Sequence, residues 1–150
     1  MSKRKEIIDA LVQAYWKELE TVQNYIANSV NLEGVRAEQI KDSLAKDVGE
    51  ELTHAQTLAR RIHELGGVVP GSLEFKAEQT AMQPPADSTD VVSVIRGVIA
   101  AEEDAIQHYN KLIQLTDGED YVTQDLVIGL LADEESHRRQ FEGFLKEFER

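Results

Sequence analysis

Apolar residues recur every three or four positions along four long stretches of the chain. Residues three and four apart share one face of a helix, so this spacing is typical of amphipathic helices. The first stretch keeps it as far as Ile26 and Val30, and the third includes Tyr109. No stretch alternates as a half-buried strand does, so an all-α fold is predicted. The expected helices span about 5–31, 37–65, 91–115 and 121–149.

The connections between these helices differ in length. The first and third have about five residues each, which suits antiparallel helical hairpins. The second, at about 66–88, has about 23 residues and is too long for an ordinary helix–helix loop. Fully extended, it reaches about 75 Å, well beyond the length of about 40 Å of one helix. We therefore expect a single domain, residues 1–150: a four-helix bundle of two antiparallel hairpins joined by one long crossover.

Ionisable residues interrupt the apolar faces of all four helices. An unpaired carboxylate in such a position would cost several kcal/mol. Two of the helices repeat a Glu-x-x-His pattern, in "EELTHA" at 50–55 and "DEESHR" at 133–138. Residues i and i+3 share a helix face, so each pattern presents a carboxylate and an imidazole together. The candidate ligands are Glu18, Glu51, His54, Glu102, Glu134 and His137.

The spacing of these ligands repeats between the two hairpins. Glu18 precedes Glu51 by 33 residues, and Glu102 precedes Glu134 by 32. Each glutamate lies about thirteen or fourteen residues into its helix, so the six side chains should meet at the centre of the bundle. Two divalent cations would neutralise the four carboxylates, two of which can bridge the ions. Carboxylate and imidazole ligands suit iron, manganese or zinc, and open coordination positions allow redox chemistry.

Some neighbouring acidic residues leave alternatives. Glu103 could replace Glu102 as the ligand of the third helix. Glu20, Glu50 and Glu135 lie off the apolar faces, so we expect them to be solvated. The alternative to a metal centre is a structural bundle in which the glutamates form salt bridges by chance.

Tyr25 lies two turns after Glu18 on the same helix face. It is a candidate electron or hydrogen-bond donor near the metals, with a packed core tyrosine as the alternative. His63 and His108 have no partner at ligand spacing, so we expect surface or otherwise satisfied histidines.

The charge and composition of the chain exclude several classes of partner and site. The formal net charge is −12, which argues against binding to nucleic acid or anionic membranes. No apolar run approaches the roughly 18 residues of a membrane span. The chain has no cysteine, which excludes disulfides and thiolate metal sites. The N-terminal stretch does not resemble a signal peptide, so a cytoplasmic location is expected.

The segments that carry the candidate ligands resemble the ferritin superfamily: "ELETVQNY" at 18–25, "EELTHA", "AEEDAIQHY" at 101–109 and "LLADEESH" at 130–137. The chain is most similar to bacterioferritin and to Dps-like mini-ferritins with a metal site inside the bundle. The resemblance implies a ferroxidase that binds two iron ions, oxidises them with O2 or H2O2 and stores ferric mineral in a hollow shell. It also implies roles for the ligands: Glu18, Glu102, His54 and His137 terminal, Glu51 and Glu134 bridging, and Tyr25 beside the site.

The sequence departs from this family at two points. Bacterioferritin binds haem between subunits through a methionine where this chain has Leu52, so no haem is expected. Typical 24-subunit ferritins carry a fifth helix, for which the residues after Glu134 leave no room. A homo-oligomer of twelve subunits is therefore favoured, with 24 subunits or a dimer as alternatives.

Two competing functions remain. One is a dimeric di-metal oxidase or peroxidase that stores nothing. The other is a DNA-protecting mini-ferritin, for which "SKRK" at 2–5 is the only basic arm.

Overall fold

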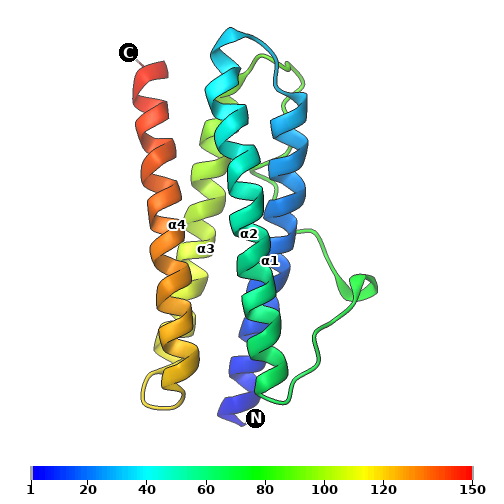
Figure 1. The fold of residues 1–150 in the computed structure, drawn as a ribbon, viewed down its shortest axis with the longest axis vertical. Helices are drawn as coiled ribbons and strands as arrows, with labels where there is room; N and C mark the ends of the chain where they lie inside the picture. Colours follow the sequence, from blue (N-terminus) through cyan, green and yellow to red (C-terminus); the bar gives the residue numbers. More distant parts are fainter. Residues whose placement is uncertain (1, 150) are drawn as a thin grey trace.

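Four long helices account for most of the molecule (Figure 1). The computed structural model describes residues 2–149, and no strand occurs among them. The all-α prediction is therefore confirmed. The elements are α1 (Lys3–Asn31), η1 (Val35–Ala37), α2 (Glu38–Glu64), η2 (Ser72–Glu74), α3 (Val91–Thr116) and α4 (Tyr121–Phe148), where η marks a single 3-10 turn.

Local sequence signals fix the ends of these helices. The Asp90 carboxylate accepts a hydrogen bond from the backbone N–H of Ser93 and caps α3. Asp120 caps α4 in the same way through the N–H of Thr123. Gly66 follows α2 with a φ of 86°, a left-handed conformation that glycine adopts without steric cost. The predicted helix boundaries therefore lie within a few residues of the observed ones.

The helices form two antiparallel hairpins, α1 with α2 and α3 with α4 (Figure 1). The crossover at 65–90 runs the length of the bundle, from the end of α2 to the start of α3, as predicted. The view in Figure 1 places α2 and α4 on the near face, with α1 and α3 behind them. Within residues 2–149, no helix is long and apolar enough to cross a lipid bilayer.

The second half of the crossover is tied to α1 by hydrogen bonds. The Glu20 carboxylate accepts the backbone N–H groups of Glu78 and Gln79 at 2.8 and 2.9 Å. The Asn28 side chain donates to the carbonyl of Met82, whose own side chain is buried. The prediction that Glu20 is solvated is wrong, because the crossover covers it.

The hydrophobic core is divided into two clusters. One includes Leu44, Ile95 and Phe141, and the other includes Leu11 and Leu112. Along each helix the two clusters are separated by a buried glutamate, at about the middle of the bundle. The core is therefore interrupted by a polar layer at the level where the sequence predicts ligands.

Candidate metal centre

The structure brings all six predicted ligand residues together in this polar layer. Each long helix contributes a glutamate, and α2 and α4 each add the histidine one turn later. None of the six is more than 6% exposed: Glu18, Glu51, His54, Glu102, Glu134 and His137. Glu102 lies in the cluster and Glu103 is exposed, so the alternative ligand on α3 is not part of the centre.

The six side chains form two overlapping groups. Glu18, Glu51, His54 and Glu134 each place one ligand atom within 4.8 Å of the others, and so do Glu51, Glu102, Glu134 and His137. Glu51 and Glu134 belong to both groups. Two glutamates shared between two sets of ligands are the arrangement needed to bridge a pair of cations.

Both histidines turn Nδ1 toward the glutamates. The Nδ1 atom of His54 lies 3.0 Å from Glu134 Oε1 and 3.5 Å from Glu18 Oε2. The Nδ1 atom of His137 lies 3.1 Å from Glu51 Oε1. One ring nitrogen of each histidine is therefore directed at the shared carboxylates.

Two buried tyrosines support the outer glutamates of the centre. The Tyr25 hydroxyl, on α1, donates a hydrogen bond to Glu102 on α3. The Tyr109 hydroxyl, on α3, donates to Glu18 on α1 at 2.6 Å. Each tyrosine follows its own helix's glutamate by seven residues. Sequence reasoning assigned Tyr109 to the apolar face alone, although this repeated spacing was a signal that it resembles Tyr25.

Burial disfavours negative charge on all four glutamates. It is the largest cause that raises the pKa of Glu18, Glu51 and Glu102. It also raises the pKa of Glu134 to about 7, despite the hydrogen bonds with Glu102 and His54 that act in the opposite direction. Without cations, the four carboxylates therefore tend to retain protons.

The same cluster favours the charged form of both histidines, because the neighbouring glutamates raise their pKa values. Burial lowers the pKa of His137, but Glu51, Glu102 and Glu50 more than offset it and raise that pKa to about 10. For His54 burial acts likewise, and Glu134, Glu18 and Glu51 raise its pKa well above the ordinary value. Positive charge is therefore favoured at the centre of the cluster, which is where cations would lie.

Several atoms of the cluster are buried without an aligned hydrogen bond. They are one oxygen each of Glu18 and Glu102, both oxygens of Glu51, and both ring nitrogens of His137. Buried polar atoms are normally paired, so these point to a missing partner. Four carboxylates and two imidazoles are ligands that suit iron, manganese or zinc, and the residues present therefore fit a pair of such ions.

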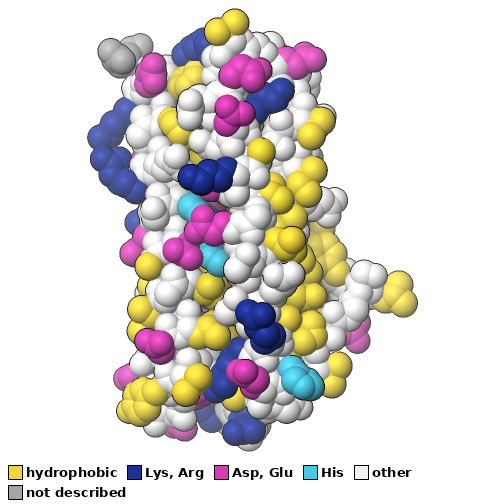
Figure 2. All heavy atoms as spheres, viewed as in Figure 1, with side chains coloured by type: hydrophobic (Ala, Val, Ile, Leu, Met, Phe, Trp, Pro, Cys, Tyr) yellow, Lys and Arg dark blue, Asp and Glu magenta, His cyan; other side chains and the backbone are white. Residues whose placement is uncertain are grey.

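A second layer of acidic residues lies outside the histidines. The Nε2 atom of His54 lies 2.9 Å from Asp133 Oδ2. The Nε2 atom of His137 lies 3.0 Å from Glu50 Oε2 and 3.9 Å from Asp47 Oδ1. Figure 2 shows histidine and acidic side chains together midway along the face of α2 and α4. Glu50, which was expected to be solvated, has a side chain that is 40% exposed, and it also faces a histidine across the gap between these helices.

The other histidines and the remaining off-face glutamate lie away from this centre. The Nε2 atom of His108 is 2.8 Å from the carbonyl oxygen of Ala10. His63 and Glu135 are exposed. The prediction of satisfied or surface histidines is confirmed, and so is the prediction that Glu135 is solvated.

The sequence is similar to those of two kinds of known protein. A bacterial ferritin of Neisseria meningitidis is 28% identical over 148 residues, covering 97% of this chain and 90% of its own. A DNA protection during starvation protein of Pyrococcus furiosus is 26% identical over 144 residues, covering 94% of this chain and 77% of its own.

Solved structures share the fold. A dodecameric thioferritin, the bacterioferritin-related protein of Bacteroides fragilis, superimposes with a TM-score of 0.85 at 26% identity, covering 98% of this chain and 88% of its own. A ferritin-like, diiron-carboxylate protein of Bacillus anthracis gives a TM-score of 0.85 at 22% identity, covering 97% and 99%. The family model for the ferritin-like domain matches residues 8–150, and this chain therefore belongs to the ferritin family.

Proposed function

We propose that this protein is a ferroxidase that binds two ferrous ions in the mid-bundle centre and oxidises them with O2 or H2O2. The observation that carries the proposal is the pair of four-residue groups that share Glu51 and Glu134. Family membership and the diiron-carboxylate description of the Bacillus anthracis neighbour support the same chemistry. Manganese or zinc would suit the same ligands.

Each half of the centre would bind one ion, and two glutamates would be shared between the halves. Glu18 and His54 would hold one ion, Glu102 and His137 the other, and Glu51 and Glu134 would bridge them. Bound there, two ferrous ions supply one electron each, so that H2O2 and two protons give two water molecules.

The surroundings of the centre support its ligands. Tyr25 and Tyr109 orient the outer glutamates through hydrogen bonds. The two hydrophobic clusters above and below exclude water along the bundle axis. Both features hold the carboxylates in place before a cation binds, which limits the reorganisation that binding requires.

Substitution of a bridging glutamate tests this proposal. Ferrous iron is added to the metal-free protein without oxygen, O2 or H2O2 follows, and ferric product is measured by absorbance. Glu51→Ala should slow oxidation at least about tenfold, because both ions lose a ligand. Glu103→Ala removes an exposed carboxylate of the same kind and should leave the rate unchanged. Equal rates for the two variants would overturn the proposal.

Storage depends on the assembly, and we propose a shell of twelve subunits. The support is the dodecameric neighbour from Bacteroides fragilis. A native mass near twelve times 16.9 kDa, with ferric iron that stays with the protein, is the expected result. A dimer that retains no iron would instead indicate an oxidase or peroxidase without storage.

The similarity to a DNA protection protein does not require contact with DNA. The net charge of −12 opposes binding to a polyanion. We propose that any protection by this chain comes from the removal of ferrous iron and peroxide, and a gel shift at physiological salt should show no complex.

A further inference from the structure

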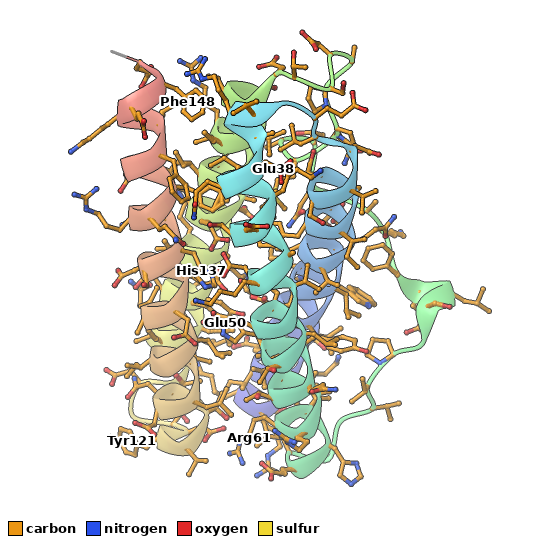
Figure 3. All side chains as sticks on the ribbon, turned by 45° about the horizontal axis from the view of Figure 1, so that its top comes forward. Glu38, Glu50, Arg61, Tyr121, His137 and Phe148 are labelled. Carbon is orange, nitrogen blue, oxygen red and sulfur yellow. The ribbon has the colours of Figure 1, made fainter. Side chains whose placement is uncertain are left out.

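Two cavities adjoin on the side of the bundle where the crossover runs past α1. The first, of about 300 Å³, lies between α1 and the part of the crossover that contains Pro70 and Phe75. Figure 3 shows the crossover around η2 standing away from α1, and this cavity lies beneath that excursion. The second, of about 340 Å³, lies between α1, α3 and the part that contains Lys76 and Glu78. None of the six metal ligands lines either cavity.

The first cavity is mainly apolar. Tyr15 and Trp16 line it from α1, and Phe75 lines it from the crossover. All three rings are half-buried, so part of each remains accessible. The volume lies at the lower end of the range for small-molecule sites. Aromatic rings pack favourably against one another, so this cavity suits a flat ring.

The second cavity is polar, and its carboxylates already have partners. Glu20 accepts two backbone N–H groups of the crossover. Asp104 lies 2.8 Å from the Nζ atom of Lys17, and Glu78 lies 3.9 Å from the same atom. The acids of this cavity are therefore engaged in holding the crossover, α1 and α3 together.

Two lysines of the second cavity lack such a partner. Lys76 lines it from the crossover and Lys111 from α3, and neither takes part in an ion pair within residues 2–149. A molecule that enters the cavity therefore meets two ammonium groups that no carboxylate of the described chain holds. Ammonium groups donate hydrogen bonds and accept none, so they favour an anion.

The two cavities meet at Trp16, which lines both. On each wall an aromatic residue of the apolar cavity is followed directly by a lysine of the polar one: Trp16 by Lys17 on α1, and Phe75 by Lys76 on the crossover. Consecutive Cα atoms are about 3.8 Å apart, so a single small molecule can contact both environments.

We propose that the two cavities form one binding site for a small amphiphilic anion: its aromatic ring packs against Trp16 and Phe75, and its carboxylate is held by Lys76 and Lys111. The net charge of −12 opposes any anion. At physiological salt, however, charges more than about 8 Å away are largely screened, so the two nearby ammonium groups have the larger effect. The site goes beyond the proposed ferroxidase reaction and does not depend on it.

Fluorescence of the full-length protein gives the first test, because Trp16 is the single tryptophan of the chain. Phenylbutyrate, which carries a ring and a carboxylate, should change this fluorescence in a saturable way. Phenylbutanol has the same ring without the charge and should bind more weakly. Butyrate lacks the ring and should also bind more weakly. Added salt should weaken the binding of phenylbutyrate alone.

Substitution of the lysines tests the charged half of the site. Lys76→Gln and Lys111→Gln should each weaken phenylbutyrate binding about three- to fivefold, because the contact with an exposed ammonium group is partly screened. Both should leave phenylbutanol binding unchanged. Lys146→Gln removes an exposed lysine of α4 and is the matched control, which should bind both compounds as wild type does.

Substitution of the ring tests the apolar half. Phe75→Ala should weaken the binding of phenylbutyrate and phenylbutanol alike, because both lose the same apolar contact. Leu73→Ala removes a fully exposed side chain from the same excursion of the crossover and should change neither. All of these variants should oxidise ferrous iron at the wild-type rate, since none changes a residue of the metal centre.

Three results would overturn the proposal. The first is no saturable change of Trp16 fluorescence with phenylbutyrate. The second is equal affinity of wild type for phenylbutyrate and phenylbutanol. The third is that Lys76→Gln and Lys111→Gln both bind phenylbutyrate as Lys146→Gln does. Since ferrous iron oxidation is measured separately, each of these results leaves the proposed metal centre intact.

Discussion

The centre is built from residue pairs that the two hairpins repeat. Glu18 and Tyr25 on α1 correspond to Glu102 and Tyr109 on α3, and each tyrosine donates to the glutamate of the other helix. The exchange fixes both outer carboxylates from inside the core. The two tyrosines should therefore make comparable contributions to holding the metal ligands.

Removal of one hydroxyl tests this reciprocity. Tyr109→Phe leaves Glu18 Oε1 buried without its donor, which should cost about 1–3 kcal/mol of stability. It should also weaken the binding of the metal ion that Glu18 and His54 would hold. Thermal melting and cobalt titration measure the two effects. Tyr121→Phe, which changes an exposed ring, is the control, and identical behaviour of both variants would contradict the assigned role.

The ligands could be predicted from sequence because they conflict with their surroundings. A glutamate on an apolar helix face needs a compensating partner, and Glu51 and Glu134 stand out for this reason. Tyr109 does not conflict with an apolar face, and Glu50 lies outside one. Periodicity indicates which way a side chain points from its own helix. It does not reveal the hydrogen bonds that cross to another helix.

At the scale of elements, the crossover is the part that periodicity could not place. Its length predicted that it spans the bundle, but its contacts depend on Glu20 and on a close approach to α3. At Gly97, an added Cβ atom would lie 2.3 Å from the carbonyl oxygen of Ala81. Periodicity also does not reveal how much of an apolar face is covered. Ile26 and Val30 continue the apolar spacing of α1, yet they are 47% and 70% exposed.

A pair of glycine substitutions tests the docking of the crossover. Gly97→Ala should destabilise the protein by about 1–3 kcal/mol, because backbone must move to relieve the contact. Gly129→Ala, in α4, meets nothing within 4 Å and should stabilise the protein by up to about 1 kcal/mol through helix propensity. Urea unfolding measures both. A stabilising effect at Gly97 would mean that the crossover does not lie against α3 as described.

At the scale of the whole molecule, the polar layer lowers the stability of the metal-free protein and provides ligands for cations. Four buried carboxyl groups divide a core that would otherwise be continuous, and burial together with neighbouring carboxylates disfavours their charged forms when no cation is bound. Metal binding should therefore stabilise the native state strongly, because it acts on the native protein alone.

The stability of the metal-free protein should fall as pH rises from about 5.5 to 8. The pKa of Glu134 is raised from 4.5 to about 7 in the native state, so the native state binds more protons than the unfolded state between these values. The pKa of His137 is raised from 6.5 to about 10, so its stabilising contribution is present below 6.5 and is lost as pH rises toward 10. Both effects have the same sign.

Melting temperatures with a chelator and with zinc check this dependence. The metal-free protein should melt several degrees lower at pH 8 than at pH 5.5. The rise in melting temperature caused by zinc should be larger at pH 8, since the ligands must lose their protons to bind. Greater stability of the metal-free protein at the higher pH would be inconsistent with the charge balance described for the centre.

Anomalous diffraction from crystals soaked anaerobically in ferrous iron would test the central claim most directly. The predicted result is two iron peaks in the polar layer, one beside Nδ1 of His54 and one beside Nδ1 of His137, with Glu51 and Glu134 contacting both. Iron found only at surface carboxylates, or no iron between the four helices, would contradict it.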